Sequence, residues 1–171
     1  RRPDRSAAGR GLRGLADDLP IVERLEKHIW LAEAKHISAQ FVLDGTRLAC
    51  AEMLRGGTTC FNDMYFYPKA VAEAAVSSGI RAAIGLITVD FPTAYASDAD
   101  DYLAKGLSAR DELINEPLLS FCLAPHAPYT VNDRNFTQAL TLAEQCEIPI
   151  HIHLHETKQE IEDSRQSYGI R

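Results

Sequence analysis

Three histidines and a glutamate lie close together in the segment IPIHIHLHE, residues 148–156. If this segment is a β-strand, side-chain alternation places His151, His153 and His155 on one face and the aliphatic residues on the other. Neutral imidazole is a preferred zinc ligand, and a carboxylate beside a metal ion can move the protons of a bound water. The spacing therefore favours a metal-assisted hydrolytic site that includes Glu156. Buried, hydrogen-bonded core histidines are the alternative interpretation.

Polar residues also follow the other predicted strands. Asn62 and Asp63 follow the first, Asp90 follows the second, and His126 follows the third, between two prolines in APHAPYT. In parallel α/β proteins the loops after the strands converge at one edge, where active sites are built. We therefore expect one site at this edge. An ordinary loop histidine is the alternative for His126, and a cap of the turn before Pro68 is the alternative for Asp63.

Apolar periodicity and turn residues predict the elements that would position these side chains. Short strands alternate with helices of ten or more residues, which is typical of consecutive βα units and a parallel sheet. Ser38 is the expected N-cap of one helix, Asn132 or Asp133 lies near the start of another, and Gly79 closes a third. The predicted strands cover residues 58–61, 80–89, 118–123 and 148–154, and the predicted helices cover 38–54, 68–78, 98–114, 131–146 and 157–168, after a first helix that begins near Pro20 and includes Trp30.

The spacing of about 30 residues per unit is that of a (β/α)₈ barrel, which needs on the order of 250 residues. A chain of 171 residues has room for about half of one. We therefore expect an α/β fold, a partial barrel of parallel strands with flanking helices, and not a doubly wound dinucleotide domain, because no G-x-G-x-x-G loop occurs. Residues 15–171 would form this barrel domain, and the Arg- and Gly-rich residues 1–14 a poorly ordered arm. Both ends suggest a fragment.

The composition excludes two classes of partner. The net charge is −6, and the 18 lysines and arginines form no sustained block, which argues against binding to nucleic acid or to an anionic membrane. The apolar runs are too short to span a bilayer. The four cysteines show no CxxC spacing, which indicates free thiols in a reducing, cytoplasmic location.

Five segments carry a resemblance to a known family: GLADDLP, HIWLAEA, DGTRLACAEMLRGGTTCFNDMYFYP, APHAPYT and HIHLHET. Together they resemble the amidohydrolase superfamily, in particular its branch of 5-methylthioadenosine/S-adenosylhomocysteine deaminases and the related triazine and chlorohydrolase-like (TRZ/ATZ) enzymes. The resemblance extends from about Leu12 to Arg171. It implies a (β/α)₈ barrel, one divalent metal that is normally zinc, and hydrolytic deamination of a small purine nucleoside.

The resemblance also implies roles for individual residues. His153 matches a metal-binding histidine, and Glu156 matches the catalytic glutamate that contacts the substrate and moves protons. His126 and Glu33 match substrate-binding residues, with Trp30 beside Glu33. Without the resemblance, Glu33 would be interpreted as a solvated charge near the end of a helix.

Other positions depart from the family pattern. The family has His-x-His where this chain has Asp4, Arg5 and Ser6. A further histidine and a metal-binding aspartate would lie beyond Arg171. We therefore expect this chain alone to be inactive, and we hypothesise that a frame error or gene-call boundary near residue 11 explains the abrupt divergence. The alternatives are a related enzyme acting on a triazine, guanine or cytosine-type ring, or an inactive truncated remnant. A homo-oligomer is the expected assembly.

Overall fold

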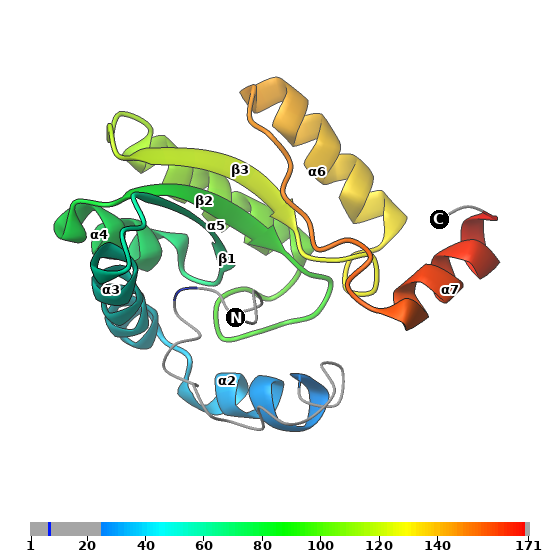
Figure 1. The fold of residues 1–171 in the computed structure, drawn as a ribbon. Helices are drawn as coiled ribbons and strands as arrows, with labels where there is room; N and C mark the ends of the chain where they lie inside the picture. Colours follow the sequence, from blue (N-terminus) through cyan, green and yellow to red (C-terminus); the bar gives the residue numbers. More distant parts are fainter. Residues whose placement is uncertain (1–6, 8–24, 170–171) are drawn as a thin grey trace.

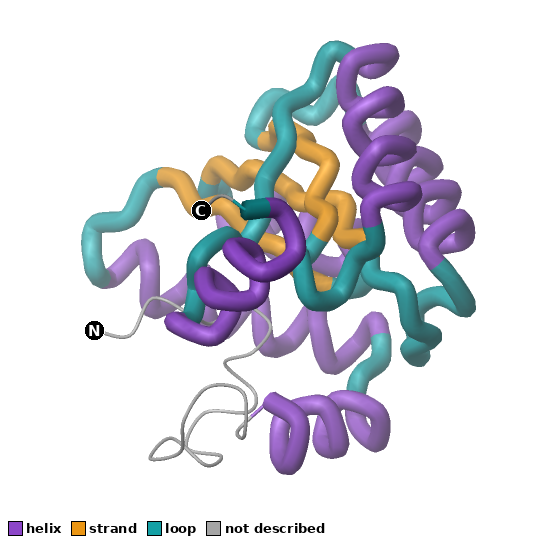
Figure 2. Tube along the Cα trace, turned by 90° about the vertical axis from the view of Figure 1, so that its right-hand side faces the viewer, coloured by secondary structure: helices purple, strands orange, loops and turns teal. Residues whose placement is uncertain are grey.

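The computed structural model describes Ala7 and residues 25–169 (Figure 1). Most of the predicted arm, residues 1–14, lies outside the described residues, as does the start of the helix predicted from Pro20. Three parallel strands form an open sheet with helices beside it. Seen from the side in Figure 2, the strands form one layer, and the C-terminal helix lies in front of them.

The described elements alternate as the sequence predicts. Their bounds are η2 (Leu25–Ile29, one π-helical turn), α2 (Trp30–His36), α3 (Ala39–Arg55), β1 (Cys60–Tyr65), α4 (Pro68–Ser78), β2 (Arg81–Thr88), α5 (Ala99–Leu113), β3 (Leu119–Pro125), α6 (Asp133–Cys146) and α7 (Lys158–Tyr168). Among the described residues, no helix is both long enough and apolar enough to cross a lipid bilayer.

The sheet is built around β2, which pairs with β1 on one side and with β3 on the other. The register pairs Tyr65 at the end of β1 with Leu86, and Pro125 at the end of β3 with Thr88. Helices α4 and α5 pack against β2, and α6 packs against β3. Because all three strands are parallel, their carboxyl ends lie at one edge, and α2 lies below that edge in Figure 1.

Local side chains fix where the helices begin. Ser38 Oγ accepts a hydrogen bond from Phe41 N–H at the start of α3, and Asn132 Oδ1 accepts from Asn135 N–H at the start of α6. These bonds satisfy backbone donors that have no partner within the helix. The prediction of Ser38 as an N-cap is confirmed, and of the two residues expected near the start of α6, Asn132 is the N-cap and Asp133 the first helical residue. Gly79 closes α4 with a φ of 70°, as expected of a left-handed C-terminal residue.

Two predictions about strands are corrected by the structure. The first strand runs from Cys60 to Tyr65, so Asn62 and Asp63 lie within it and not after it. The predicted fourth strand, residues 148–154, is not a regular strand. It runs beside β3 in Figure 1, but it forms only one isolated bridge, between Leu123 and Ile150.

The reason lies in the sequence of β3. Three main-chain hydrogen bonds join residues 149–153 to β3 and its following residue, so the segment follows the edge of β3. After Leu123, the next residue of β3 that would donate to the segment is Pro125, which has no N–H, so a regular ladder cannot continue. His155 then takes a left-handed φ of 57°, which ends the extended course.

Candidate functional site

His126 is the first residue after β3, and a neighbouring threonine holds its ring. The Nδ1 atom lies 2.9 Å from Thr130 Oγ1, and the Thr130 hydroxyl itself donates to the carbonyl oxygen of Ala127 at 3.1 Å. Because the hydroxyl proton is already used, Thr130 accepts from an N–H at Nδ1. This arrangement leaves the lone pair of Nε2 available to accept a hydrogen bond from a ligand.

The ring of His126 also packs against His153. The two ring centroids are 5.0 Å apart at an interplanar angle of 83°, and the main-chain N–H of His153 donates to the His126 carbonyl oxygen at 3.0 Å. Burial and, to a smaller extent, charge repulsion from the neighbouring His153 together lower the pKa of His126 to about 4. His126 is therefore a neutral imidazole at neutral pH.

Glu156 is tied to the same region through a tyrosine. The hydroxyl of Tyr129 donates to Glu156 Oε2 at 2.8 Å, and the Tyr129 ring meets the His126 ring edge-on, with centroids 6.0 Å apart. Glu156, Tyr129, His126 and His153 thus form one connected group, which we call the β3-end group. A carboxylate and a neutral imidazole acceptor within such a group can exchange protons with a ligand.

The other two histidines of the segment differ from each other. The ring of His151 packs edge-on against His153 at 6.1 Å, and its Nδ1 is buried without a hydrogen-bond partner among the described residues. Burial lowers its pKa. His155 is exposed, and its backbone is left-handed. The predicted alternation therefore does not extend to His155, because the main chain is not extended there.

A second group lies at the end of β1. The hydroxyl of Tyr65, the last residue of β1, donates to Glu33 Oε1 at 2.5 Å. Glu33 is therefore not a freely solvated charge. Burial raises its pKa, and the hydrogen bond from Tyr65 lowers it again in part. In the same helix α2, the ring of Trp30 packs against Phe91, which follows β2, with centroids 5.9 Å apart. We call these four residues the β1-end group.

Asp63 takes a place that the sequence did not predict. Its side chain is only 3% exposed, and its Oδ1 accepts a hydrogen bond from the Ala7 main-chain N–H at 2.7 Å. It is therefore not a cap of the turn before Pro68. Burial raises its pKa to about 6, against the lowering effect of the bond from Ala7. Its Oδ2 has no hydrogen-bond partner among the described residues.

A catalytic zinc ion needs about three protein ligands that converge on one point. Within residues 25–169 and Ala7, no three His, Cys, Asp or Glu side chains form such a group. The resemblance implies that His153 is one ligand. Its neighbour His126 does not offer Nδ1 as a second ligand atom, because that atom is hydrogen-bonded to Thr130. The described residues therefore do not by themselves fit a zinc ion.

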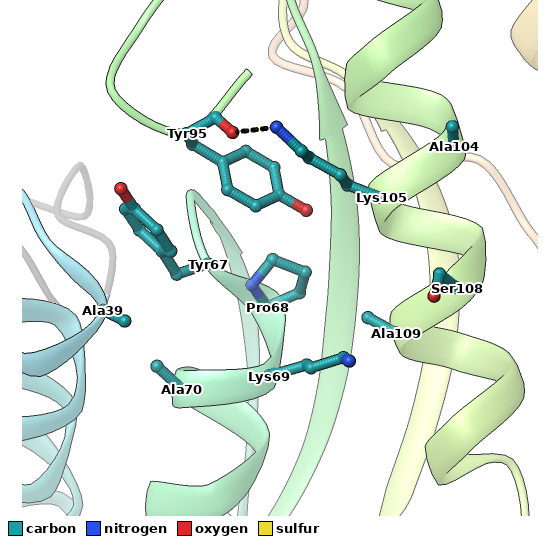
Figure 3. A pocket seen from close by; sticks show the side chains of 10 residues that line it. All are labelled: Ala39, Tyr67, Pro68, Lys69, Ala70, Tyr95, Ala104, Lys105, Ser108 and Ala109. Carbon is teal, nitrogen blue, oxygen red and sulfur yellow. Dashed lines mark hydrogen bonds between the residues drawn. The ribbon is translucent and has the colours of Figure 1, made fainter.

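A cavity of about 480 Å³ lies away from both groups (Figure 3). It lies between the N-terminal end of α4 and helix α5, and the rings of Tyr67 and Tyr95 meet edge-on beside it. The Tyr67 hydroxyl donates to the Ala94 carbonyl oxygen, and Lys105 Nζ donates to that of Tyr95. These contacts hold the loop between β2 and α5 in place, and Phe91 belongs to this loop.

The structure thus brings together some of the predicted site residues and separates others. Glu156, His126 and His153 share the β3-end group, whereas Glu33 and Trp30 belong to the β1-end group. The sequence analysis missed Tyr65, Tyr129 and Phe91. Both tyrosines stand within the segments FNDMYFYP and APHAPYT, whose other polar residues were singled out.

The comparisons with known proteins agree on a family. The model of the "Amidohydrolase family" matches residues 12–171. A 5-methylthioadenosine/S-adenosylhomocysteine deaminase from Saccharophagus degradans is 52% identical over 159 residues, which cover 93% of this chain and 36% of the relative. A 5'-deoxyadenosine deaminase from Methanospirillum hungatei is 41% identical and is covered over 35% of its length. The chain therefore spans about a third of the length of the curated relatives it matches.

Solved structures give the same result. A zinc-bound adenosine deaminase from Xanthomonas campestris superimposes with a TM-score of 0.92 at 49% sequence identity, covering 97% of this chain and 38% of that one. Guanine deaminase from C. acetobutylicum, with guanine bound, gives a TM-score of 0.78 at 17% identity, and this likeness shows the fold alone.

Proposed function

Because this chain belongs to the amidohydrolase family, we propose that the whole protein deaminates an adenine nucleoside by hydrolysis. The relatives named for deaminating 5-methylthioadenosine and S-adenosylhomocysteine, at 52% and 48% identity, favour these two compounds as substrates. A partial (β/α)₈ barrel, residues 15–171, would carry the described part of the site. We also propose that the whole protein is located in the cytoplasm and forms a homo-oligomer.

One observation carries the proposal: two polar groups lie at the same edge of the sheet, at the ends of different strands. Tyr65 ends β1, and His126 follows β3. Because β2 lies between them, the two strand ends are roughly 10 Å apart across the sheet at about 4.8 Å per strand. The register also places His126 three residues further along the strand direction than Tyr65, since Tyr65 lies level with Leu86 and Leu86 with Leu123. A nucleoside has a ribose with hydroxyl donors at one end and an aminopurine at the other. We assign the ribose to Glu33 and Trp30, and the purine to the β3-end group.

The proposed reaction exchanges one substituent at purine C6. The oxygen of a water molecule bonds to C6, the bond from C6 to its amino nitrogen breaks, and the products are an inosine-type nucleoside and ammonia. Glu156 takes a proton from the attacking water and gives a proton to the leaving amino nitrogen. His126, with its Nε2 lone pair free, would accept a hydrogen bond from the substrate. Tyr129 holds the carboxylate of Glu156 in position.

The place of a metal in this proposal is limited. His153 is the described residue that would bind the zinc ion expected of the whole protein, with the other ligands supplied from outside the described residues.

The test measures ammonia release and the mass of the nucleoside product. Protein with a complete metal site should release ammonia from 5-methylthioadenosine, and its Glu156→Gln variant should lose most of that activity, on the order of a hundredfold or more. Glu162→Gln is the matched control, because Glu162 is exposed on α7. If the protein releases ammonia from guanine, cytosine or a triazine but not from adenine nucleosides, this proposal is wrong and the enzyme acts on one of those other rings.

A binding measurement on the 171-residue chain separates a remnant from an enzyme part. Titration calorimetry with 5-methylthioadenosine should detect binding that weakens in Glu33→Gln. If the chain binds no nucleoside and the longer protein has no activity, the chain is an inactive remnant that descends from a deaminase.

A further inference from the structure

Glu160 is a charged residue buried at the start of α7, outside the set of residues that the resemblance assigns. It is 7% exposed. Its Oε1 accepts a hydrogen bond from the main-chain N–H of His155, and its Oε2 accepts one from the N–H of Glu156, each at 2.7 Å. Both carboxylate oxygens are thus used on two consecutive amides. Hydrogen bonds to an ionised carboxylate are about twice as strong as neutral ones.

These bonds differ from ordinary helix capping. Thr157 is the N-cap of α7, and its Oγ1 accepts from the Glu160 N–H at 3.1 Å. In the usual capping box, a glutamate three residues after the N-cap reaches back to the N-cap amide itself. Here the carboxylate passes that amide and binds the two residues before it. Its bonds therefore fix the chain that enters the helix and leave the helix's own amides to Thr157.

The segment that Glu160 holds has an unfavourable backbone. His155 has a φ of 57°, in the left-handed region, which costs a residue other than glycine on the order of 1 kcal/mol. Neither His155 nor Glu156 is buried by packing, since both are exposed. This turn is held by three hydrogen bonds. Two go from its amides to Glu160, and the third goes from Tyr129 to the Glu156 carboxylate.

We propose that Glu160 is a positioning residue for Glu156. By holding the amides of His155 and Glu156, it fixes the turn after residues 149–153, so that the Glu156 carboxylate stays at the Tyr129 hydroxyl in the β3-end group. The functional meaning rests on the proposed role of Glu156 in proton transfer, but the positioning itself is a property of the folded chain. It can be measured without any catalytic activity.

The experiment compares Glu160→Gln with Glu162→Gln in the 171-residue chain. Both variants remove one carboxylate charge from α7, but Glu162 is exposed and pairs with Arg165. Amide hydrogen exchange followed by NMR should speed up at His155, Glu156 or both by on the order of tenfold to a hundredfold in Glu160→Gln, the range for a lost bond to a charged group. The cross-peak between the Tyr129 ring and the Glu156 side chain should weaken at the same time. Glu162→Gln should change neither.

Two results would overturn the proposal. One is unchanged exchange at both amides and an unchanged cross-peak in Glu160→Gln. The other comes from Thr157→Ala, which weakens the same helix start but keeps the Glu160 carboxylate. If it exposes the two amides and removes the cross-peak as much as Glu160→Gln does, Glu160 only stabilises the helix. None of these measurements depends on deamination. A negative result would therefore disprove the role of Glu160 without contradicting the proposed function.

Discussion

At the scale of single residues, Tyr65 is the side chain whose role is easiest to isolate. Its hydroxyl donates to Glu33, and this bond offsets part of the rise in the Glu33 pKa that burial causes. Tyr65→Phe should therefore raise the pKa of Glu33 further, measurable by carbon NMR of the carboxyl group. Affinity for 5-methylthioadenosine should fall by up to about tenfold, because without this bond the Glu33 side chain is ordered only when the ligand binds, which costs about 0.5–1.5 kcal/mol.

A matched control for this change is Tyr168→Phe. Tyr168 also donates its hydroxyl to a carboxylate, that of Asp133, but it lies on the surface of α7 and is 61% exposed. Its loss should leave nucleoside affinity unchanged. An unchanged Glu33 pKa in Tyr65→Phe would show that Tyr65 does not stabilise the ionised carboxylate.

His126 allows a prediction about pH. Its folded-state pKa is lowered to about 4, below its ordinary value of 6.5, mainly by burial. Its contribution to stability is therefore complete above pH 6.5 and is lost as the pH falls through the window from 6.5 to about 4. An NMR titration of the His126 ring should show a midpoint near 4 and a proton on Nδ1. Thr130→Val should remove the preference of the ring proton for Nδ1, because the hydroxyl acceptor is lost. A titration midpoint of His126 near 6.5 in the unchanged chain would show that burial does not lower its pKa.

At the scale of secondary structure, the sequence predicted well where local chemistry decides. The bounds of α4 were predicted to the residue, because Pro68 and Gly79 mark its ends, and Ser38 was recognised as a cap. The prediction of a fourth strand was wrong, since alternation in IPIHIHLHE does not reveal that its hydrogen bonding to β3 is interrupted at Pro125, which has no N–H to donate. The partners Tyr65 and Glu33 could not be predicted, because a contact between residues 32 positions apart depends on the fold.

The tight packing of β1 against β2 gives a prediction at the same scale. A Cβ added at Gly85 would lie 2.7 Å from the Asp63 carbonyl oxygen and 3.1 Å from the Ala124 Cβ. Gly85→Ala should therefore destabilise the chain by about 3 kcal/mol, as overpacking of a core does. Urea unfolding checks this value. Gly57→Ala is the control, because φ is +80° there but nothing lies within 4 Å, so only backbone strain of about 1 kcal/mol is expected. Equal costs for the two would mean that β1 and β2 separate without penalty.

At the scale of the whole molecule, the two halves of the candidate site lie at one edge of the sheet and are connected there. The loop after β2 joins them, because Asp90 accepts hydrogen bonds from Asn132 and Asn135 at the start of α6, whereas Phe91 next to it packs on Trp30. A ligand that contacts both groups would therefore bind to a single body formed by α2, the sheet and α6. Helix α7 is attached through Glu160 in its first turn and through the hydrogen bond from Tyr168 to Asp133 at its end.

The last prediction concerns zinc and the start of the chain. His153 alone cannot hold the ion, and the resemblance places two histidine ligands at positions that are Asp4 and Ser6 here. Ala7, which directly follows Ser6, is anchored by its bond to the buried Asp63 at 2.7 Å. The double substitution Asp4→His and Ser6→His should therefore raise bound zinc, measured by elemental analysis after dialysis, from well below one to about one ion per chain. Adding His153→Ala should abolish this gain because three ligands become two. Equal zinc contents in all these proteins would mean that the start of this chain does not reach the end of the sheet where His153 lies.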